Sequence, residues 1–458
     1  MTTANTALQQ DTKHPPGLYL LFFTELWERF SFYGMRALLT LYLTTALISG
    51  GLGYNEATAL SIYGLYTGAT YFTPMAGGYL SDRFLGRRLA ITIGGISMAL
   101  GNFALFAVHS RTGLYLGLAL LIFGNGFFKP NISTLVGELY GKNDPRRDAA
   151  FTIFYMGINL GGFLAPLVCG FLAEEAFRTT VDGVVRYGFR YGFLAAAIGM
   201  VIGQILFNTL GNRYLGDIGK KTAATASGPD AAKSREPLTR GERQRTAVII
   251  IITCFVVFFW AGFEQAGSSL TLYTEKFVDR DLFGWTVPTS WFQSVNPLLI
   301  ILLAPAVSVL WLKLARSPRG DLKVPTKMAL GMILLGLGYM VLLVAVSQSG
   351  GDEANITHKV NMLFIVFTYL LHTLGELALS PVGLSLVSKI APLKLASLLM
   401  GVWFASTGVA NILGGQLAAF TQSLGYFEVF LVIGVMAIAL GFVLLALSPK
   451  LVRMMESE

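Results

Sequence analysis

The stretch ELWERFSFYG, Glu25 to Gly34, places two glutamates and an arginine inside an apolar run that begins at Gly17. A charged side chain at the middle of a membrane-spanning helix costs about 2.5–3.5 kcal/mol on insertion scales. Because a helix turns by about 100° per residue, the polar and aromatic residues of this run share one face. That face carries Glu25, Glu28, Arg29, Phe32, Tyr33 and Arg36. The stripe indicates a helix that lines a cavity inside a bundle; a structural ion-pair seam between helices is the alternative.

The rest of the chain predicts a polytopic membrane protein. Of its 458 residues, 54% are hydrophobic and only 13% are charged, whereas about 25% of a soluble domain is charged. A spanning helix needs about 20 mostly apolar residues. The first 16 residues are polar and include two prolines, which argues against a cleavable signal peptide. The sequence predicts twelve spans, within 18–47, 58–80, 89–109, 112–136, 150–173, 189–210, 246–275, 289–313, 325–347, 359–390, 396–422 and 425–447.

The distribution of basic residues predicts the orientation. With the N-terminus in the cytoplasm, 24 of the 34 Lys and Arg residues fall in inner segments and 5 in outer loops. Inner loops of membrane proteins carry this excess. Both termini are therefore expected in the cytoplasm. The net charge of +8 follows from topology and contact with anionic lipid, so no nucleic-acid partner is expected.

The long polar segment 211–245 divides the predicted spans into six and six. It contains the low-complexity piece KKTAATASGPDAAKSREP, and FYMGINLGG (154–162) is echoed by ASTGVANILGG (405–415). Two such halves meeting at a central site are typical of secondary transporters. The expected organisation is an N-terminal tail (1–17), a six-helix bundle (18–210), a linker (211–245), a second bundle (246–447) and a C-terminal tail (448–458).

The loop sequence GGYLSDRFLGRR (77–88) follows the second predicted span. It resembles the gating loop of major facilitator transporters, which implies that Asp82, Arg83 and Arg87 bond to a neighbouring helix end. An ordinary basic inner loop is the alternative. The resemblance implies an all-α membrane protein with the major facilitator fold.

Several other predicted spans carry isolated polar groups. The charged ones are Lys129, Glu264 and Glu376, and the amide side chains of Asn159 and Asn296 accompany them. With the first span, these make three buried cations and four buried anions, which are expected to form pairs because unpaired buried charges are strongly destabilising.

The distribution of these charges suggests a zwitterionic ligand. The cations lie in the N-terminal half, and Glu376 lies with Asn296 in the other half. Aromatic side chains between them would accept varied side chains. A short peptide fits better than an amino acid or an organic anion. The predicted pocket residues are Phe32, Tyr33, Tyr71, Tyr155, Ser380 and Trp403.

Six motifs together resemble the proton-dependent oligopeptide transporter family. They are ELWERFSFYGMR (25–36), GNGFFKPNIS (124–133), RRDAAFTIFYMGINLGG (146–162), FWAGFEQAG (259–267), SVNPL (294–298) and GELALSPVGLS (375–385).

The resemblance implies a role for each polar residue. Proton coupling would involve Glu25, Glu28, Arg29 and Glu264; the peptide carboxylate would bind Arg29, Tyr33, Arg36 and Lys129; and its amino terminus would bind Asn159, Asn296 and Glu376. Arg36–Glu264 would clamp the outward-closed state and Lys129–Glu376 the inward-closed state. The implied activity is proton-coupled import of di- and tripeptides through a bacterial inner membrane.

The chain departs from the family at three places. Segment 211–245 is too short for the two extra helices of many bacterial members, the second span has Tyr63–Gly64 where mammalian relatives have a histidine, and Phe32 replaces a tyrosine. A carrier of another zwitterionic or anionic solute remains an alternative.

A membrane hydrolase that uses His372 and Glu376, or the glutamates of the first span, is disfavoured. The sequence shows no nucleophile with a base, no cofactor motif and no third metal ligand, so no enzyme is expected. His372 could be a packed side chain, a proton relay or one of two metal ligands, and two ligands are too few. No metal, cofactor or obligate protein partner is expected.

Overall fold

A computed structural model describes residues 13–141, 144, 146–220, 238–318, 320–350, 356, 358–392 and 395–456. The low-complexity part of the predicted linker, 221–237, lies outside the described residues, as do positions 1–12.

The first half of the chain forms six long helices where the first six spans were predicted. Each apolar run has the length that a bilayer requires, and the helix ends follow local signals such as Pro16 at the first turn of α1 and the Asn55 side chain that caps α2. The helices are α1 (Pro16–Thr44), α2 (Glu56–Leu80), α3 (Arg87–Ala107), α4 (Arg111–Glu138), α5 (Arg147–Phe171) and α6 (Phe189–Leu215).

The second half forms a matching series of long helices, some with short helical extensions. They are α7 (Arg240–Phe263), η7 (Glu264–Gly267), α8 (Ser269–Phe277), η8 (Thr289–Ser294), α9 (Val295–Ala315), α10 (Val324–Ser349), α11 (Leu363–Ile390), α12 (Ala396–Ala419), α13 (Thr421–Leu424) and α14 (Tyr426–Met455). A capping box between Thr239 and Glu242 starts α7.

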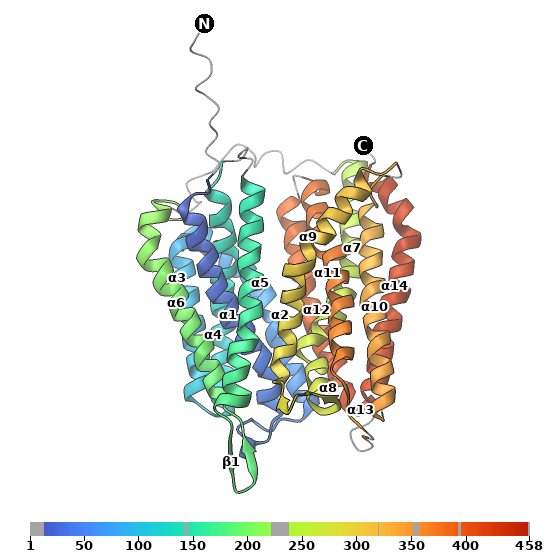
Figure 1. Ribbon diagram of the computed structural model, residues 1–458. Helices are drawn as coiled ribbons and strands as arrows, with labels where there is room; N and C mark the ends of the chain where they lie inside the picture. The colour runs from blue at the N-terminus through green and yellow to red at the C-terminus, as the bar shows by residue number, and fades with distance from the viewer. Residues whose placement is uncertain are drawn as a thin grey trace.

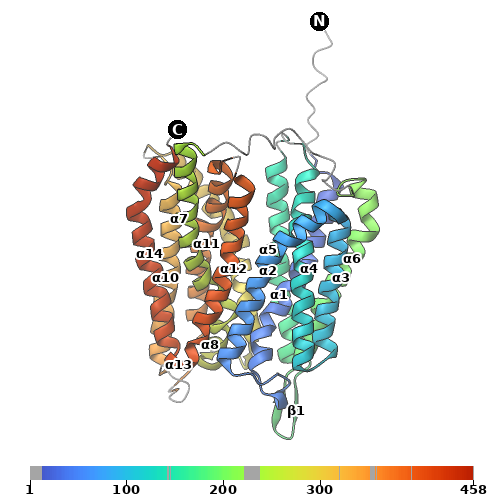
Figure 2. The ribbon, with the colours of Figure 1, turned by 180° about the vertical axis from the view of Figure 1, so that it is seen from behind.

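The two halves stand side by side, with α1–α6 in one group and α7–α14 in the other (Figures 1 and 2). The start of α1 and the end of α14 lie at the end of the molecule opposite the β1–β2 hairpin (Thr179–Val181 and Val184–Arg186) (Figure 1). The groups touch closely where α2 meets α12. A Cβ added to Gly64 would lie 2.6 Å from the Cα of Gly415, so this approach requires glycine on both helices.

Ten helical segments among the described residues are long and apolar enough to cross a membrane. Helices α1 and α2 are comparable in length, with 29 and 25 residues, and α1 carries the charged stripe. The protein is therefore an all-helical membrane protein apart from short strands.

Three elements differ from the sequence prediction. The seventh span is not one continuous α-helix, because the helix is interrupted from Glu264 to Ser268. Glycine and serine residues there disfavour a continuous helix. The last helix continues through Pro449 to Met455, so most of the predicted C-terminal tail is helical. Helix α6 extends to Leu215 and α7 starts at Arg240, which shortens the predicted linker at both ends.

Candidate functional site

A cavity of about 200 Å³ lies between the two halves of the chain. Helices α1, α2 and α5 form one wall, and α7, η7, η8, α9 and α11 form the other. The predicted site residues that line it are Tyr33, Arg36, Tyr71, Tyr155, Asn159, Glu264, Asn296, Glu376 and Ser380.

Arg36 and Glu264 form an ion pair that joins the halves at this cavity. The Arg36 Nε also donates to the Tyr63 hydroxyl of α2 at 2.6 Å. Glu264 is the first residue after α7, at the break in the seventh span. This break places its carboxylate at the helix end facing α1. The Arg36–Glu264 pair implied by the sequence resemblance is thus formed in this structure, and its role as an outer clamp stays a prediction.

The charges of the opening motif divide into two groups along α1. Arg29 pairs with Glu28 and lies 3.2 Å from a Glu25 oxygen. All three side chains are buried, and none lines the cavity. Tyr33 and Arg36, one and two turns further along α1, do line it. The first part of the motif therefore forms a cluster of charges that pair with one another, and the second part lines the cavity.

The opposite wall presents a carboxylate held by an amide. The Asn296 Nδ2 donates to a Glu376 oxygen and to the Thr373 hydroxyl, both at 2.9 Å. No cation among the described residues pairs with Glu376, so its charge is available to a bound ammonium group.

Lys129 has no carboxylate partner among the described residues. Its Nζ lies 4.1 Å from the centre of the Tyr71 ring, and Tyr71 lines the cavity while Lys129 does not. The implied inner clamp between Lys129 and Glu376 is not formed in this structure.

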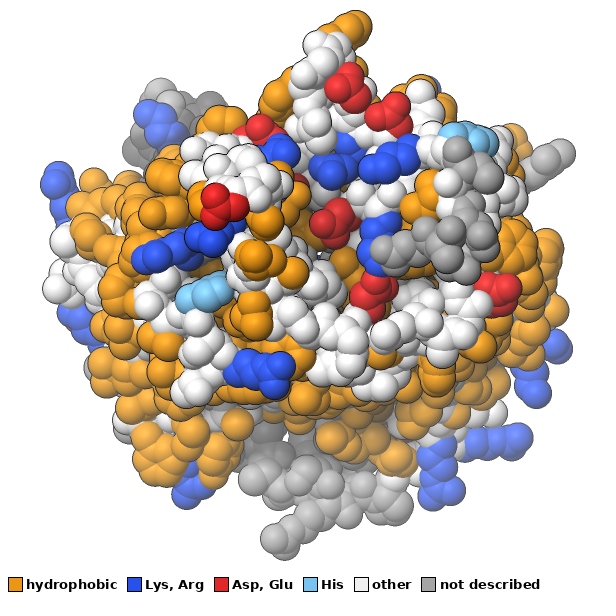
Figure 3. All heavy atoms as spheres, turned by 90° about the horizontal axis from the view of Figure 1, so that it is seen from below, with side chains coloured by type: hydrophobic (Ala, Val, Ile, Leu, Met, Phe, Trp, Pro, Cys, Tyr) orange, Lys and Arg blue, Asp and Glu red, His pale blue; other side chains and the backbone are white. Residues whose placement is uncertain are grey.

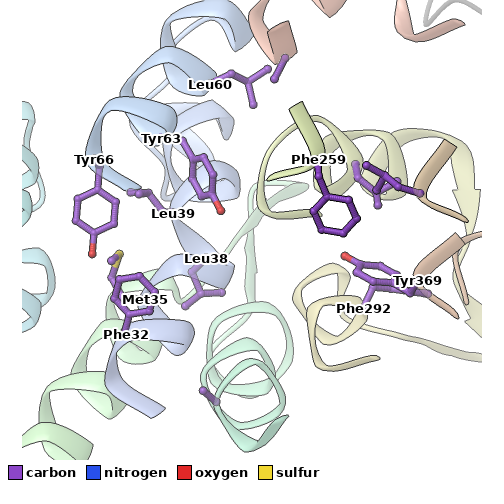
Figure 4. Close-up of a cluster of buried hydrophobic side chains, with 14 of the residues drawn as sticks. Phe32, Met35, Leu38, Leu39, Leu60, Tyr63, Tyr66, Phe259, Phe292 and Tyr369 are labelled. Carbon is purple, nitrogen blue, oxygen red and sulfur yellow. The ribbon is translucent and has the colours of Figure 1, made fainter. Parts of the chain in front are cut away.

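Two predicted pocket residues, Phe32 and Trp403, do not line this cavity. Phe32 is buried in the hydrophobic cluster beside Met35 (Figure 4) and lies 5.1 Å below the Arg29 guanidinium. Trp403 is buried near Gly383 of α11. The surroundings of both side chains depend on the neighbouring helices, which the spacing of residues along one helix does not reveal.

His372 also lies away from the cavity lining. It is buried, and its ring centre lies 5.0 Å from that of Tyr339. Among the described residues, no three His, Cys, Asp or Glu side chains are grouped to hold a metal ion.

The predicted gating loop forms specific contacts. Arg87 pairs with Glu138 at the end of α4 and lies 3.1 Å from Asp82. Arg83 instead donates to the Tyr79 hydroxyl at 2.5 Å. Gly86 has a φ of +76°, a left-handed conformation that favours glycine.

The end of the molecule around the β1–β2 hairpin holds cross-contacts that the sequence did not predict. Figure 3 shows acidic and basic side chains gathered over the centre of this end. The buried Glu174 carboxylate accepts hydrogen bonds from the backbone N–H groups of Thr289 and Ser290, at 2.6 and 3.0 Å. Glu56 of α2 pairs with Lys276 of α8. In the sequence these residues look like ordinary loop charges.

Further hydrogen bonds close the same end. The Trp291 Nε1 donates to the Leu167 carbonyl at 3.0 Å, and the Ser294 hydroxyl donates to the Phe163 carbonyl at 2.8 Å. The Thr40 hydroxyl donates to the Gly267 carbonyl at 2.6 Å. The two halves are therefore joined at the hairpin end by ion pairs and by hydrogen bonds between side chains of one half and backbone groups of the other.

Comparisons with known proteins agree with this architecture. The uncharacterized transporter YclF of Bacillus subtilis (strain 168) is 36% identical, over 97% of this chain and 95% of the relative. The peptide transporter YePEPT of Yersinia enterocolitica is 32% identical, over 90% of this chain and 88% of the relative. The dipeptide and tripeptide permease A of Escherichia coli (strain K12) is 30% identical, over 100% and 98%.

Solved structures show the same fold. A crystal structure of the peptide transporter POT in complex with sulfate is 35% identical, with a TM-score of 0.86 over 97% of this chain and 96% of that one. A POT family transporter in complex with 5-aminolevulinic acid is 31% identical, with a TM-score of 0.85 over 96% and 97%. Residues 88–227 and 232–445 match the model of the POT family. The chain is therefore a transporter that belongs to the POT family.

Proposed function

We propose that this chain is a proton-coupled symporter that imports di- and tripeptides by alternating access. The observation that carries the proposal is a single cavity with Arg36 on one wall and the Asn296–Glu376 pair on the other. A peptide zwitterion has a carboxylate for the first and an ammonium for the second. The peptide and dipeptide–tripeptide names of two relatives support this assignment.

In this proposal the peptide carboxylate approaches the cationic wall. Arg36 and Tyr33 line the cavity, whereas Arg29 and Lys129 lie behind the lining in this structure. Arg29 would reach the ligand after its pairing with Glu28 changes, and Lys129 after its Nζ leaves the Tyr71 ring. The amino terminus would bind Glu376 with the amide oxygens of Asn296 and Asn159. The aromatic rings of Tyr71 and Tyr155, with Ser380, would form the sides of the pocket.

Transport would proceed by rocking of two bundles, 18–210 and 246–447, each with six membrane-spanning helices. The formed Arg36–Glu264 pair and the absent Lys129–Glu376 pair support an outward-closed state. Both termini would be cytoplasmic, and the membrane would be a bacterial inner membrane. The gating-loop residues Asp82, Arg83 and Arg87 would hold the cytoplasmic ends of α2, α3 and α4 during this motion.

Protons would act by neutralising a carboxylate that pairs with an arginine. Glu25, Glu28 and Glu264 are the candidates, because each lies beside Arg29 or Arg36. A proton that enters down the membrane potential supplies about 2.3 kcal/mol per 100 mV. That is enough to concentrate a neutral peptide more than tenfold.

A second candidate function is proton-coupled transport of another small zwitterionic or anionic solute. The structural neighbour bound to 5-aminolevulinic acid supports it, since that ligand carries an amino group and a carboxylate.

Uptake of labelled dialanine into proteoliposomes, driven by an inward proton gradient, separates the two candidate functions. We expect unlabelled di- and tripeptides to compete more strongly than 5-aminolevulinic acid. Stronger competition by 5-aminolevulinic acid would favour the second function.

A further inference from the structure

Gln293, in η8, lines the cavity and was not among the residues predicted from the sequence. Its side chain is partly exposed to the cavity. It lies one helical turn before Asn296 in the chain. Its amide therefore projects near the polar wall that would hold the amino terminus.

Hydrogen bonds fix the orientation of the Gln293 amide. The Nε2 donates to the Thr271 hydroxyl oxygen at 3.1 Å and to the Ala37 carbonyl at 3.4 Å. The Thr271 hydroxyl hydrogen is already donated to the Ala266 carbonyl, at 2.7 Å. Both groups facing the amide can therefore only accept, and only an NH₂ group satisfies them. A flipped amide would place two acceptors against each other.

This orientation leaves the Gln293 carbonyl oxygen as the group without a partner. It accepts no hydrogen bond from any residue that the structure describes. Asn296 repeats the arrangement, since both hydrogens of its amide go to Thr373 and Glu376. Two tethered amides on neighbouring turns thus have carbonyl oxygens available to donors.

The donors of a dipeptide are its ammonium group and the N–H of its backbone amide. The ammonium already has Glu376 and the Asn296 oxygen on the proposed amino-terminal side. We propose that the Gln293 oxygen accepts a hydrogen bond from the backbone amide N–H of the bound peptide. This inference rests on the proposed function and names the substrate group that distinguishes a peptide from other zwitterions.

The hydrogen bond from Gln293 to the Ala37 carbonyl also links this contact to the hairpin end of the molecule. Ala37 belongs to α1, in the first half, and Gln293 to η8, in the second. When these elements separate, the Gln293 amide loses one of its two anchors. The oxygen is therefore held in place while the hairpin end is closed.

The first test needs no variant. L-alanyl-L-lactate replaces the amide N–H of dialanine by an ester oxygen and keeps both charged ends. Each compound competes against labelled dialanine in counterflow by the wild-type protein in proteoliposomes. We expect dialanine to bind about tenfold more tightly, because the ester places an acceptor against the Gln293 oxygen. Equal competition would overturn the role of Gln293.

The second test compares two identical substitutions. Gln293→Leu removes the acceptor, so the preference for dialanine over the ester should fall to below about threefold. Gln204→Leu makes the same change in α6, away from the cavity lining, and should keep the tenfold preference. A wild-type preference retained in Gln293→Leu would assign the discrimination to other residues.

Failure of the two proposals can be told apart. If wild-type protein takes up no dialanine under a proton gradient, the proposed function fails and this inference fails with it. If dialanine is taken up but Gln293→Leu leaves the ester discrimination unchanged, only the inference fails. Should Gln293→Leu not fold, Thr271→Val removes one anchor of the amide and should reduce the preference at least twofold.

Discussion

Arg36 of α1 and Glu264 at the end of α7 form an ion pair that joins the two halves of the chain beside the central cavity. The residues lie 228 positions apart in the sequence. Each carries a largely buried charge that the other compensates. The pair is therefore a link between the two halves and a part of the cavity wall at once.

The first prediction concerns this pair. Glu264→Gln leaves Arg36 without its counter-charge, and losing one partner of a buried pair costs about 3–5 kcal/mol. We expect proton-driven dialanine uptake to fall at least tenfold. Glu428→Gln, an exposed glutamate at the start of α14, is the control and should transport normally. Normal uptake by both variants would remove the pair from the transport cycle.

The second prediction concerns Lys129 and Glu376. Lys129→Ala and Glu376→Ala should each abolish uphill uptake, because each leaves an opposite charge unpaired in the inward-closed state. Counterflow should fall as well, since both groups are proposed to bind substrate. Uptake and counterflow of labelled dialanine are measured in the same proteoliposomes. Wild-type affinity in both variants would place these residues outside the site.

The third prediction concerns the peptide carboxylate. Amidation of the dialanine C-terminus should weaken binding by about 1.5–3 kcal/mol, the scale of a hydrogen bond to a charged group. This corresponds to roughly a tenfold to hundredfold weaker competitor. Competition against labelled dialanine measures the difference. Equal competition by dialanine and its amide would contradict a cationic wall that reads the carboxylate.

The fourth prediction concerns Glu174, whose carboxylate accepts two backbone N–H groups of η8. Glu174→Ala leaves these donors buried without an acceptor, which costs about 1–3 kcal/mol. We expect a larger population with the hairpin end open. Spin labels are attached to cysteines introduced by Asp182→Cys and Phe283→Cys, on loops of the two halves. The exposed Cys254 is removed by Cys254→Ser, and the distance between the two labels is measured.

The matched control is the neighbouring glutamate. Glu175→Ala removes a carboxylate that lies 3.6 Å from Arg178, with both side chains partly exposed, so little change in the distance distribution is expected. An unchanged distribution in Glu174→Ala as well would show that Glu174 does not hold this end closed.

Much of the fold was predictable, because apolar runs of bilayer length determine where the helices lie. The break at Glu264–Gly267 was not, since it depends on partners elsewhere: the Gly267 carbonyl accepts from Thr40 of α1. A run of apolar residues contains no information about such a cross-helix bond.

The site was predictable in part for the same reason. Lone polar groups in apolar helices identified Asn159, Asn296 and Glu376 as cavity residues. Gln293 was missed because its role depends on the carbonyl groups that hold it. Phe32 was assigned to the pocket from its helical face, yet that face is wide enough to reach both the cavity and the interior of the first half.

The last prediction separates coupling from binding at the opening motif. In the structure Arg29 pairs with Glu28 and lies near Glu25, while the second Glu25 oxygen has no hydrogen-bond partner among the described residues. Glu25→Gln and Glu28→Gln keep the shape of the side chain but cannot gain or lose a proton. At least one of them should lose proton-driven accumulation and retain peptide exchange without a gradient. Exchange requires only that the loaded carrier reorients, and a neutral amide resembles the protonated acid.

Arg29→Lys provides the contrast, because lysine keeps the charge but lacks the planar guanidinium that can contact both glutamates and a carboxylate. We expect this variant to impair peptide binding as well as coupling. Accumulation and exchange are measured in parallel for all three variants. If both glutamine variants retain full proton-driven accumulation, neither glutamate carries the proton, and the charges of α1 are a structural ion-pair cluster.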